Sequence, residues 1–381
     1  MAVPVITLIG AGASYASGDY EANSRPPLTK DIFAGPYAEE VFRRHRLAQK
    51  ASRIIKRDMR ANDALVLEQA LRGLREDGNA QHAQMAFDVP LYLQELLLAY
   101  SRALDGHAER YDALVDELLK LPTHVHFVSL NYDVLLDNCL APHFPLRAID
   151  DYIVLRTDRR AKNWSLIKPH GSINWYVELA QRFDPRSPEP DLEIPEAPIE
   201  CVPSDCFDLD PLRGHLPGDP TAGARRYPAL ALPEGRKDRL ILPRDHLEFF
   251  ITSLDRAAQV DLLVLGYSAI DTEVLNLINE SSADVRRLTV LNRDVEANLA
   301  VLELIEQSGI RAIWPDTPDA SYEEWVDGDG LRAWVSEYDG VPNGPYPSLV
   351  QPQELRRRID VREYEARLGS QTERDLLNDP M

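Results

Sequence analysis

The chain has 381 residues, of which 44% are hydrophobic and 27% charged, as in an ordinary globular protein large enough for two or three domains. Its net charge of −20 argues against a general nucleic-acid-binding surface, because an acidic surface repels phosphate. No apolar run approaches the roughly 20 residues of a membrane span, and the amino terminus lacks the basic patch of a signal peptide. We therefore expect a cytoplasmic protein without direct contacts to nucleic acid or membrane.

The three cysteines, Cys139, Cys201 and Cys206, limit the metal chemistry of the chain. They form no Cys-x-x-Cys pair, and three thiolates cannot build the four-cysteine site of a structural zinc ion. We therefore expect no bound metal. So few cysteines also suit a reducing cytoplasm.

The first third of the chain begins with a strand and then becomes helical. Val3–Ile9 is a continuous apolar run, the pattern of a buried parallel strand. Over residues 37–121 the apolar side chains recur at three- and four-residue spacing, which predicts a helical insertion. Pro90 is expected in the first turn of one of these helices. The basic residues within 43–60 favour a solvated helix face, with a contact to a partner subunit as the alternative.

Strands alternate with helices in the remainder, which predicts an α/β fold with a Rossmann-like parallel sheet flanked by helices. Between residues 182 and 243 the chain is rich in proline and acidic residues, which favours a long irregular insertion. The expected strands cover residues 124–130, 153–155, 165–167, 261–266, 285–291 and 310–314. The expected helices cover residues 246–258, 295–307 and, in the acidic tail, 353–369.

These elements suggest one sheet domain over residues 1–315 and an acidic extension over residues 316–381 that contacts an oligomer or a partner. The core of the sheet domain is expected in residues 1–35, 123–180 and 240–315, with a helical insertion at 36–122 and a proline-rich insertion at 182–240.

Two glycines follow the first strand, in the segment Gly10–Ser14. They let the backbone turn tightly and approach a pyrophosphate, whose charge suits the start of the following helix. Tyr15 occupies the third glycine position of the dinucleotide fingerprint, and no strand ends in an acidic residue at the spacing that a dehydrogenase needs. The segment is thus a candidate phosphate-binding turn, with a tight turn that binds no ligand as the alternative.

Polar residues stand at the ends of three later strands, where open α/β sheets bind their ligands. Asn131 can bond a ribose hydroxyl or a water molecule, and Asp133 can either hold a neighbouring loop or cap the next helix. Gly266 and Ser268 can accept a phosphate or ribose, and Asn292 can reach an adenosine ribose. Each also fits an ordinary strand end that has no ligand.

His170 lies in the segment Lys168–Ser172. Pro169 forces Lys168 into an extended conformation, and Gly171 leaves the imidazole face open. Histidine titrates near neutral pH, which the work of a general base requires. A structural histidine beside a strand is the alternative.

Taken together and in order, these motifs resemble the sirtuin family, and in particular the sirtuin-like NAD hydrolases of bacterial antiphage defence. The resemblance covers the expected core and excludes the two insertions and the tail. It is carried by Gly10–Ser14, Arg25–Thr29, Asn131-x-Asp133, His170-Gly171-Ser172, Gly266-Tyr267-Ser268 and Asn292.

The resemblance implies that NAD is the substrate and gives each matching residue a role. His170 matches the catalytic histidine, and Asn131 lies with it beside the nicotinamide ribose. The residues implied to bind NAD are Gly10, Ala11, Gly12 and Ser14 at the pyrophosphate, Asp133 at the nicotinamide ribose, Gly266 and Ser268 at phosphate, and Asn292 at the adenosine ribose.

Deacylating sirtuins carry a four-cysteine zinc module, which this chain cannot build. We therefore expect hydrolysis of the nicotinamide–ribose bond to nicotinamide and ADP-ribose, with Asn131 orienting ribose or water and His170 acting as base or positioning ribose. Protein deacylation and NAD or ADP-ribose binding without turnover are the alternatives.

An enzyme that depletes NAD must be restrained in its own host. The resemblance therefore implies control by homo-oligomerisation, by a partner ATPase or helicase, or by a phage-derived activator. The helical insertion and the acidic tail are the segments expected to make such contacts.

Overall fold

The computed structural model describes residues 3–18, 25–28, 31–61, 70–71, 73–74, 78–104, 108–153, 162–179, 200–201, 225–230, 242–269 and 273–338. The helix expected at residues 353–369 lies outside these ranges, as do two residues of the strand expected at 153–155. The first residue of that expected strand, Ile153, is buried in a turn that follows the 3₁₀ helix Ile149–Tyr152, so no strand begins there.

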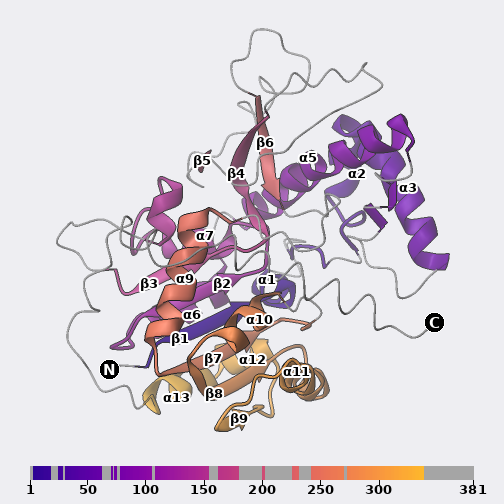
Figure 1. Ribbon diagram of the computed structural model, residues 1–381. Helices are drawn as coiled ribbons and strands as arrows, with labels where there is room; N and C mark the ends of the chain where they lie inside the picture. The colour runs from indigo at the N-terminus through magenta and orange to yellow at the C-terminus, as the bar shows by residue number, and fades with distance from the viewer. Residues whose placement is uncertain are drawn as a thin grey trace, which may run out of the picture.

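A six-stranded parallel sheet forms the centre of the protein, in the order β3-β2-β1-β7-β8-β9 (Figure 1). This confirms the predicted Rossmann-like α/β fold. Five strands lie where the apolar runs predicted them, because a strand covered on both faces needs apolar side chains throughout. The strands are β1 (Val5–Ile9), β2 (Val125–Ser129), β3 (Trp164–Ile167), β7 (Gln259–Leu265), β8 (Asp284–Leu291) and β9 (Trp314–Asp316).

The sixth strand was predicted too early in the chain. Ile310 is buried in the main core, but no strand begins until Trp314, whose side chain is exposed at the edge of the sheet. Burial against the core therefore explains the apolar residue at position 310, whereas Ile313 of the same predicted run is exposed.

Helices lie on both faces of this sheet. Crossovers between parallel strands are right-handed. The chain crosses the sheet in one direction from β1 to β3 and in the opposite direction from β3 to β9, so the helices of the two halves lie on opposite faces. Figure 1 shows α9 and α10 in front of the strands. The helices of this domain are α1 (Ala11–Ser17), α6 (Glu109–Leu118), α7 (Leu135–Leu140), α9 (Arg244–Arg256), α10 (Glu273–Glu280), α11 (Val295–Gln307), α12 (Tyr322–Asp327) and α13 (Gly330–Ser336).

A second core lies where the helical insertion meets a small antiparallel sheet, whose strand order is β5-β4-β6. The pairing of β4 with β6 corrects the expectation of a wholly irregular insertion, since β5 and β6 fall within residues 182–243. The elements are α2 (Ala38–Arg44), α3 (Arg46–Ala61), α5 (Ala80–Ala103), β4 (Gly171–Leu179), β5 (Glu200–Cys201) and β6 (Arg225–Leu230).

Pro90 lies in the middle of α5 and not in a first helical turn, which corrects that expectation. A proline inside a helix removes one hydrogen bond and costs on the order of 3 kcal/mol. Its neighbours Val89, Tyr92 and Leu93 are fully buried in the second core. Burial of these side chains offsets the lost bond.

The helices that follow residue 315 pack into the main core. Trp325 and Trp334 are buried there, and α12 and α13 both contact α6. Arg110 of α6 binds both carboxylate oxygens of Asp327, with Nε–Oδ1 at 2.9 Å and Nη2–Oδ2 at 2.6 Å. Residues 316–338 are therefore continuous with the sheet domain.

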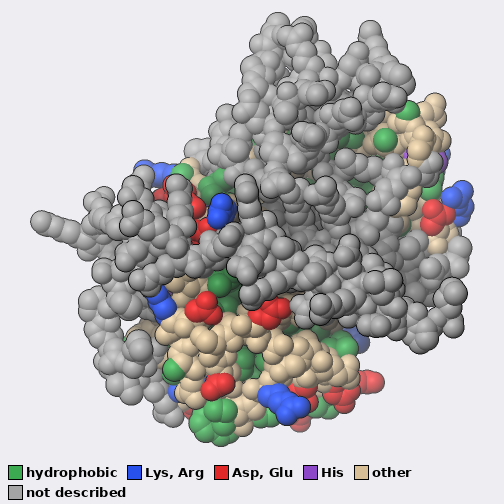
Figure 2. Space-filling model, in the orientation of Figure 1, with side chains coloured by type: hydrophobic (Ala, Val, Ile, Leu, Met, Phe, Trp, Pro, Cys, Tyr) green, Lys and Arg blue, Asp and Glu red, His purple; other side chains and the backbone are tan. Residues whose placement is uncertain are grey.

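The basic stretch of α2 and α3 is largely solvated, as expected. Arg43 and Arg44 pair with acidic residues one turn earlier on α2, and Arg53 and Arg57 are exposed on α3. Figure 2 shows acidic and basic side chains interspersed over the described part of one face. That part of the surface carries no continuous basic field.

Candidate active site

Five of the predicted motifs lie at the carboxyl ends of five neighbouring strands. Because the spatial order is β3-β2-β1-β7-β8, the motifs form one continuous arc along this edge of the sheet. Its centre is the switch point between β1 and β7, where open α/β sheets bind their ligands. The arc runs from His170 after β3, through Asn131 after β2, Gly10 after β1 and Gly266 after β7, to Asn292 after β8.

The glycine loop and Gly266 form one backbone surface. The Gly10 amide donates to the Leu265 carbonyl and the Gly12 amide to the Gly266 carbonyl, both at 2.9 Å. Gly266 has a φ of +58°, and a Cβ on it would lie 2.0 Å from the backbone nitrogen of Ala13. Only glycine fits this contact. The two segments predicted to bind phosphate are therefore adjacent. The amides of Gly10 and Gly12 donate their hydrogen bonds to carbonyls of the protein itself.

Asn131 is buried beside this loop. Its Nδ2 donates to the Gly10 carbonyl at 3.0 Å and to Ser14 Oγ at 2.8 Å. A carbonyl oxygen only accepts, so the Gly10 contact identifies the NH₂ side of the amide. The Oδ1 atom therefore points away from the glycine loop and can accept a hydrogen bond from a hydroxyl group or from water.

Asp133 follows Asn131 in the same loop after β2, and its side chain is also buried. Its Oδ1 accepts the amide of Leu135, the first residue of α7, at 3.1 Å, while the N-cap position of that helix belongs to Val134. Burial raises the pKa of Asp133, while the charge of Lys168 and a hydrogen bond from Ser14 oppose that rise. Asp133 and Ser14 thus form a buried polar layer that supports Asn131.

His170 joins the arc through the loop that carries Asn131. Its Nδ1 lies 3.3 Å from the Leu130 carbonyl, which can only accept, so Nδ1 carries a proton and Nε2 is the basic nitrogen of the neutral ring. Gly171 has a φ of +77°, and a Cβ on it would lie 1.9 Å from the Ala229 carbonyl oxygen. Glycine is required here because β6 passes directly behind the turn, a reason that the sequence did not reveal.

Lys168 lies in this site, although no role was predicted for it from the sequence pattern. Its side chain is fully buried, and Nζ donates to the Asp133 carbonyl at 2.6 Å, Asp137 Oδ2 at 3.0 Å and Ser172 Oγ at 2.6 Å. These three bonds use all three ammonium protons. Lys168 therefore ties the His170 turn to the Asn131 loop. A lysine next to a constrained proline was the only sequence signal.

Tyr111 of α6 is a second residue that the sequence did not indicate. Its hydroxyl lies 2.9 Å from Ser14 Oγ and 3.4 Å from Asn131 Nδ2. Its fully buried side chain belongs to the main core. An apolar-periodic helix position gives no sign that its hydroxyl reaches the sheet edge.

The far end of the arc is formed by the residues after β7 and β8. Asn292 Nδ2 donates to the Tyr267 carbonyl at 3.1 Å, so these strand ends are in contact. Ser268 is exposed next to them, and the following residue, Ala269, has a φ of +57°.

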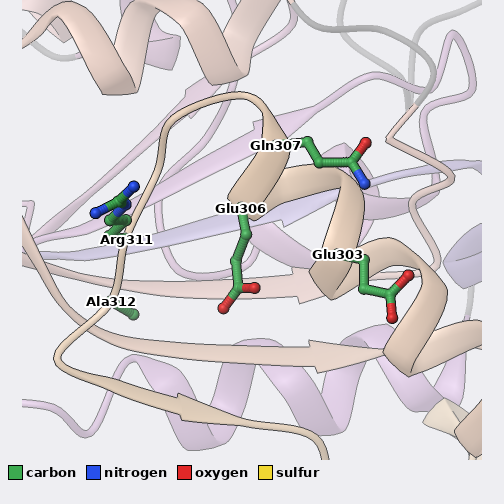
Figure 3. A pocket seen from close by; sticks show the side chains of 5 residues that line it. All are labelled: Glu303, Glu306, Gln307, Arg311 and Ala312. Atoms are coloured by element: carbon green, nitrogen blue, oxygen red, sulfur yellow. The ribbon is translucent and has the colours of Figure 1, made fainter.

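A hollow of about 480 Å³ lies away from this arc (Figure 3). It involves the carboxyl-terminal end of α11 and the segment before β9. Because α11 begins after the carboxyl end of β8 and runs back along the sheet, the carboxyl-terminal end of α11 lies towards the amino-terminal ends of the strands. The lining residues are Glu303, Glu306, Gln307, Arg311 and Ala312, and none of them is a predicted site residue.

In the ranges that the structure describes, no three His, Cys, Asp or Glu residues are grouped to hold a metal ion. Cys139 is buried, and burial raises the pKa of its thiol. None of the helices in these ranges is both long and apolar enough to cross a membrane.

No family model matches the chain, and no curated protein does. Solved structures of Sir2 homologues are similar to it. A structure of a Sir2 enzyme is 12% identical over 88% of this chain and 94% of its own, with a TM-score of 0.40. A Sir2 homologue complex with NAD is 13% identical over 80% and 89%, with a TM-score of 0.32. A mutant with 2′-O-acetyl ADP ribose is 13% identical over 88% and 93%, with a TM-score of 0.39.

Proposed function

We propose that this chain is an NAD glycohydrolase, which cleaves the bond between nicotinamide and ribose. The proposal rests on one observation. His170 is hydrogen-bonded to the carbonyl of Leu130, the residue before Asn131, at the carboxyl ends of the strands, where the glycine loop also lies. A base, an oriented amide and a closely packed backbone surface are thus adjacent. The resemblance of the motifs to sirtuin-like NAD hydrolases supports the same reaction.

The departure of nicotinamide requires no general acid from the protein. When the bond from the ribose C1′ to the pyridinium nitrogen breaks, the electron pair returns to the ring, and nicotinamide leaves neutral. Positive charge develops on the ribose, as in other glycosidic cleavages. Water then bonds to C1′ and loses a proton, which gives ADP-ribose. The site must therefore orient the ribose and remove one proton.

Asn131 and His170 divide these tasks in our proposal. Asn131 Oδ1 accepts a hydrogen bond from a ribose hydroxyl or from the attacking water, since Nδ2 is bonded to Gly10 and Ser14. His170 Nε2 takes the proton from the water, or from a ribose hydroxyl, because Nδ1 is protonated and bonded to the Leu130 carbonyl.

The remaining residues hold the rest of NAD. The glycine loop, including Ala11, and Gly266 line the pyrophosphate, where close approach of the backbone suits a bulky anion. Ser268 is exposed at the same edge for a phosphate contact, and Asn292 lies one strand further out for the adenosine ribose.

The test is nicotinamide and ADP-ribose release from NAD by the full chain and by His170→Ala and Asn131→Ala. Each variant should lose at least a hundredfold in rate, as expected when a general base or an orienting group is removed. His143→Ala is the matched control, because His143 lies exposed in the turn that follows α7 and pairs with Asp116. Undiminished release by either site variant would contradict the proposal.

The same incubation separates the two alternatives. Product formed only when an acyl-lysine peptide is added would indicate a deacylase. A stable NAD complex that gives no product would indicate a binding subunit.

A role in antiphage defence stays a prediction, as does control through a homo-oligomer, a partner ATPase or helicase, or a phage-derived activator. Comparing nicotinamide release across protein concentrations would test control by self-association, since mass action makes an oligomer-dependent rate rise faster than the concentration.

A further inference from the structure

Tyr111 reaches the candidate site from the helical layer behind it. Its side chain is 0% exposed, and its hydroxyl lies within hydrogen-bond distance of both Ser14 and Asn131. Burial raises the pKa of this phenol well above its ordinary value, so it stays a neutral hydroxyl group. The site therefore contains a neutral donor and acceptor that the reaction scheme above does not use.

The position of this hydroxyl matters because an amide side chain has two similar orientations. Exchanging Nδ2 and Oδ1 of Asn131 would aim an acceptor at the Gly10 carbonyl and a donor at the substrate. The partners of Nδ2, the Gly10 carbonyl and Ser14 Oγ, prevent the exchange. Ser14 Oγ is in turn held by Asp133 and by the Tyr111 hydroxyl at 2.9 Å. A serine hydroxyl rotates freely unless its partners fix it.

The helix that carries Tyr111 is itself fixed to the glycine-loop helix. The preceding residue, Arg110, donates to the Ala16 carbonyl of α1 and binds Asp327 of α12 through two hydrogen bonds. The Tyr111 hydroxyl therefore has a set distance from Ser14, which lies on α1. The Tyr111 hydroxyl can therefore hold the amide of Asn131 in one orientation.

We infer that Tyr111 is a positioning residue for NAD cleavage, which acts by holding Ser14 and the reactive orientation of the Asn131 amide. The inference rests on the proposed function. It assigns to α6 a direct part in the site and explains why a tyrosine, and not an apolar residue, occupies this core position.

Tyr111→Phe tests the inference, because it removes only the hydroxyl and keeps the packed ring. We expect kcat for nicotinamide release to fall roughly five- to tenfold, the loss typical of one hydrogen bond, with KM for NAD nearly unchanged. Tyr322→Phe is the matched control. Tyr322 is also buried in the main core, and no hydrogen bond from it to Asn131 or Ser14 is described.

A double-mutant cycle with Ser14→Ala distinguishes positioning from a general packing effect. If Tyr111 acts through Ser14, the double variant should lose little more activity than Ser14→Ala alone. Additive losses, an equal loss in Tyr322→Phe, or no loss in Tyr111→Phe would each overturn the inference while the proposed function stands. Absence of nicotinamide release by the unsubstituted chain would overturn the proposed function and, with it, this role.

Discussion

Lys168 Nζ lies 3.0 Å from Asp137 Oδ2, and both side chains are closed off from solvent beneath the loops that carry Asn131 and His170. Asp137 also accepts the Tyr152 hydroxyl at 2.6 Å. Two opposite charges are thus buried with hydrogen-bonded partners. Such a pair adds little net stability over an apolar pair. Removing one of the two charges, however, leaves the other buried without a partner, which is strongly destabilising.

Lys168→Met should therefore lower the free energy of unfolding by about 3–5 kcal/mol, because it leaves the Asp137 charge buried without its partner. The double variant Lys168→Met/Asp137→Leu should recover part of this loss, since it removes both charges. Urea denaturation of the two variants and the unsubstituted chain measures the difference. A double variant less stable than the single one would contradict a charge-pair explanation.

Gly266→Ala should disrupt the contact between the glycine loop and β7. The new Cβ would lie 2.0 Å from the Ala13 nitrogen, and the backbone there has a positive φ. We expect a loss of more than about 1 kcal/mol in stability and a larger loss in NAD binding, because the loop must move. Thermal unfolding and calorimetric titration with NAD measure the two effects.

Gly73→Ala is the control for that substitution. A Cβ on Gly73 would meet no atom within 4 Å, and the residue is helical. Alanine should be neutral there or stabilise by up to about 1 kcal/mol. Equal losses in the two variants would rule out the steric explanation.

The strand-end positions that form the arc could be predicted because each part of the arc is local. A buried parallel strand is a short apolar run, and a ligand-binding turn follows it directly, so Asn131 after β2 and Gly266 after β7 could be found without the fold. Their adjacency then follows from the strand order, since β1 lies between β2 and β7.

The parts that the sequence did not predict depend on contacts between distant residues. Tyr111 is 97 positions from Ser14, and the pairing of Gly171 with Leu230 crosses a proline-rich stretch. Pro228 lies in β6, where a proline argues against an interior strand. Local pattern contains no information about which distant segment completes such a pair.

Loss of the proton from His45 should make the helical insertion less stable at alkaline pH. Burial lowers its pKa, but the hydrogen bonds and charges of Asp88 and Glu95, at 2.9 and 2.8 Å, outweigh burial and raise the pKa to about 9. The folded state therefore holds this proton more tightly than the unfolded state. Its contribution is complete below pH 6.5 and is lost as the pH rises towards 9.

That loss should amount to roughly 3 kcal/mol between pH 6.5 and 9 in the unsubstituted chain. His45→Gln keeps a hydrogen-bonding side chain but cannot take a proton, so its stability should be lower and nearly independent of pH over this range. Urea midpoints at half-unit pH steps measure both curves. Parallel curves would show that another group causes the alkaline loss.

Two buried histidines should have the opposite effect on the acid side. Burial lowers the pKa of His126, on β2, and of His246, on α9, to about 3 in each case. Below pH 6.5 the unfolded state binds protons that these side chains cannot bind in the fold. The unfolding free energy should therefore fall as the pH decreases from 6.5 towards 3, by on the order of 2 kcal/mol per histidine at pH 5.

His246→Gln separates this effect from the titration of carboxylates. The glutamine Nε2 can replace the histidine Nε2 that donates to the Ile149 carbonyl at 2.9 Å, but the side chain takes up no proton. The variant should lose less stability between pH 6.5 and 5 than the unsubstituted chain, whatever its stability at pH 7. An unchanged slope would indicate that His246 is already protonated in the fold or does not become buried on folding.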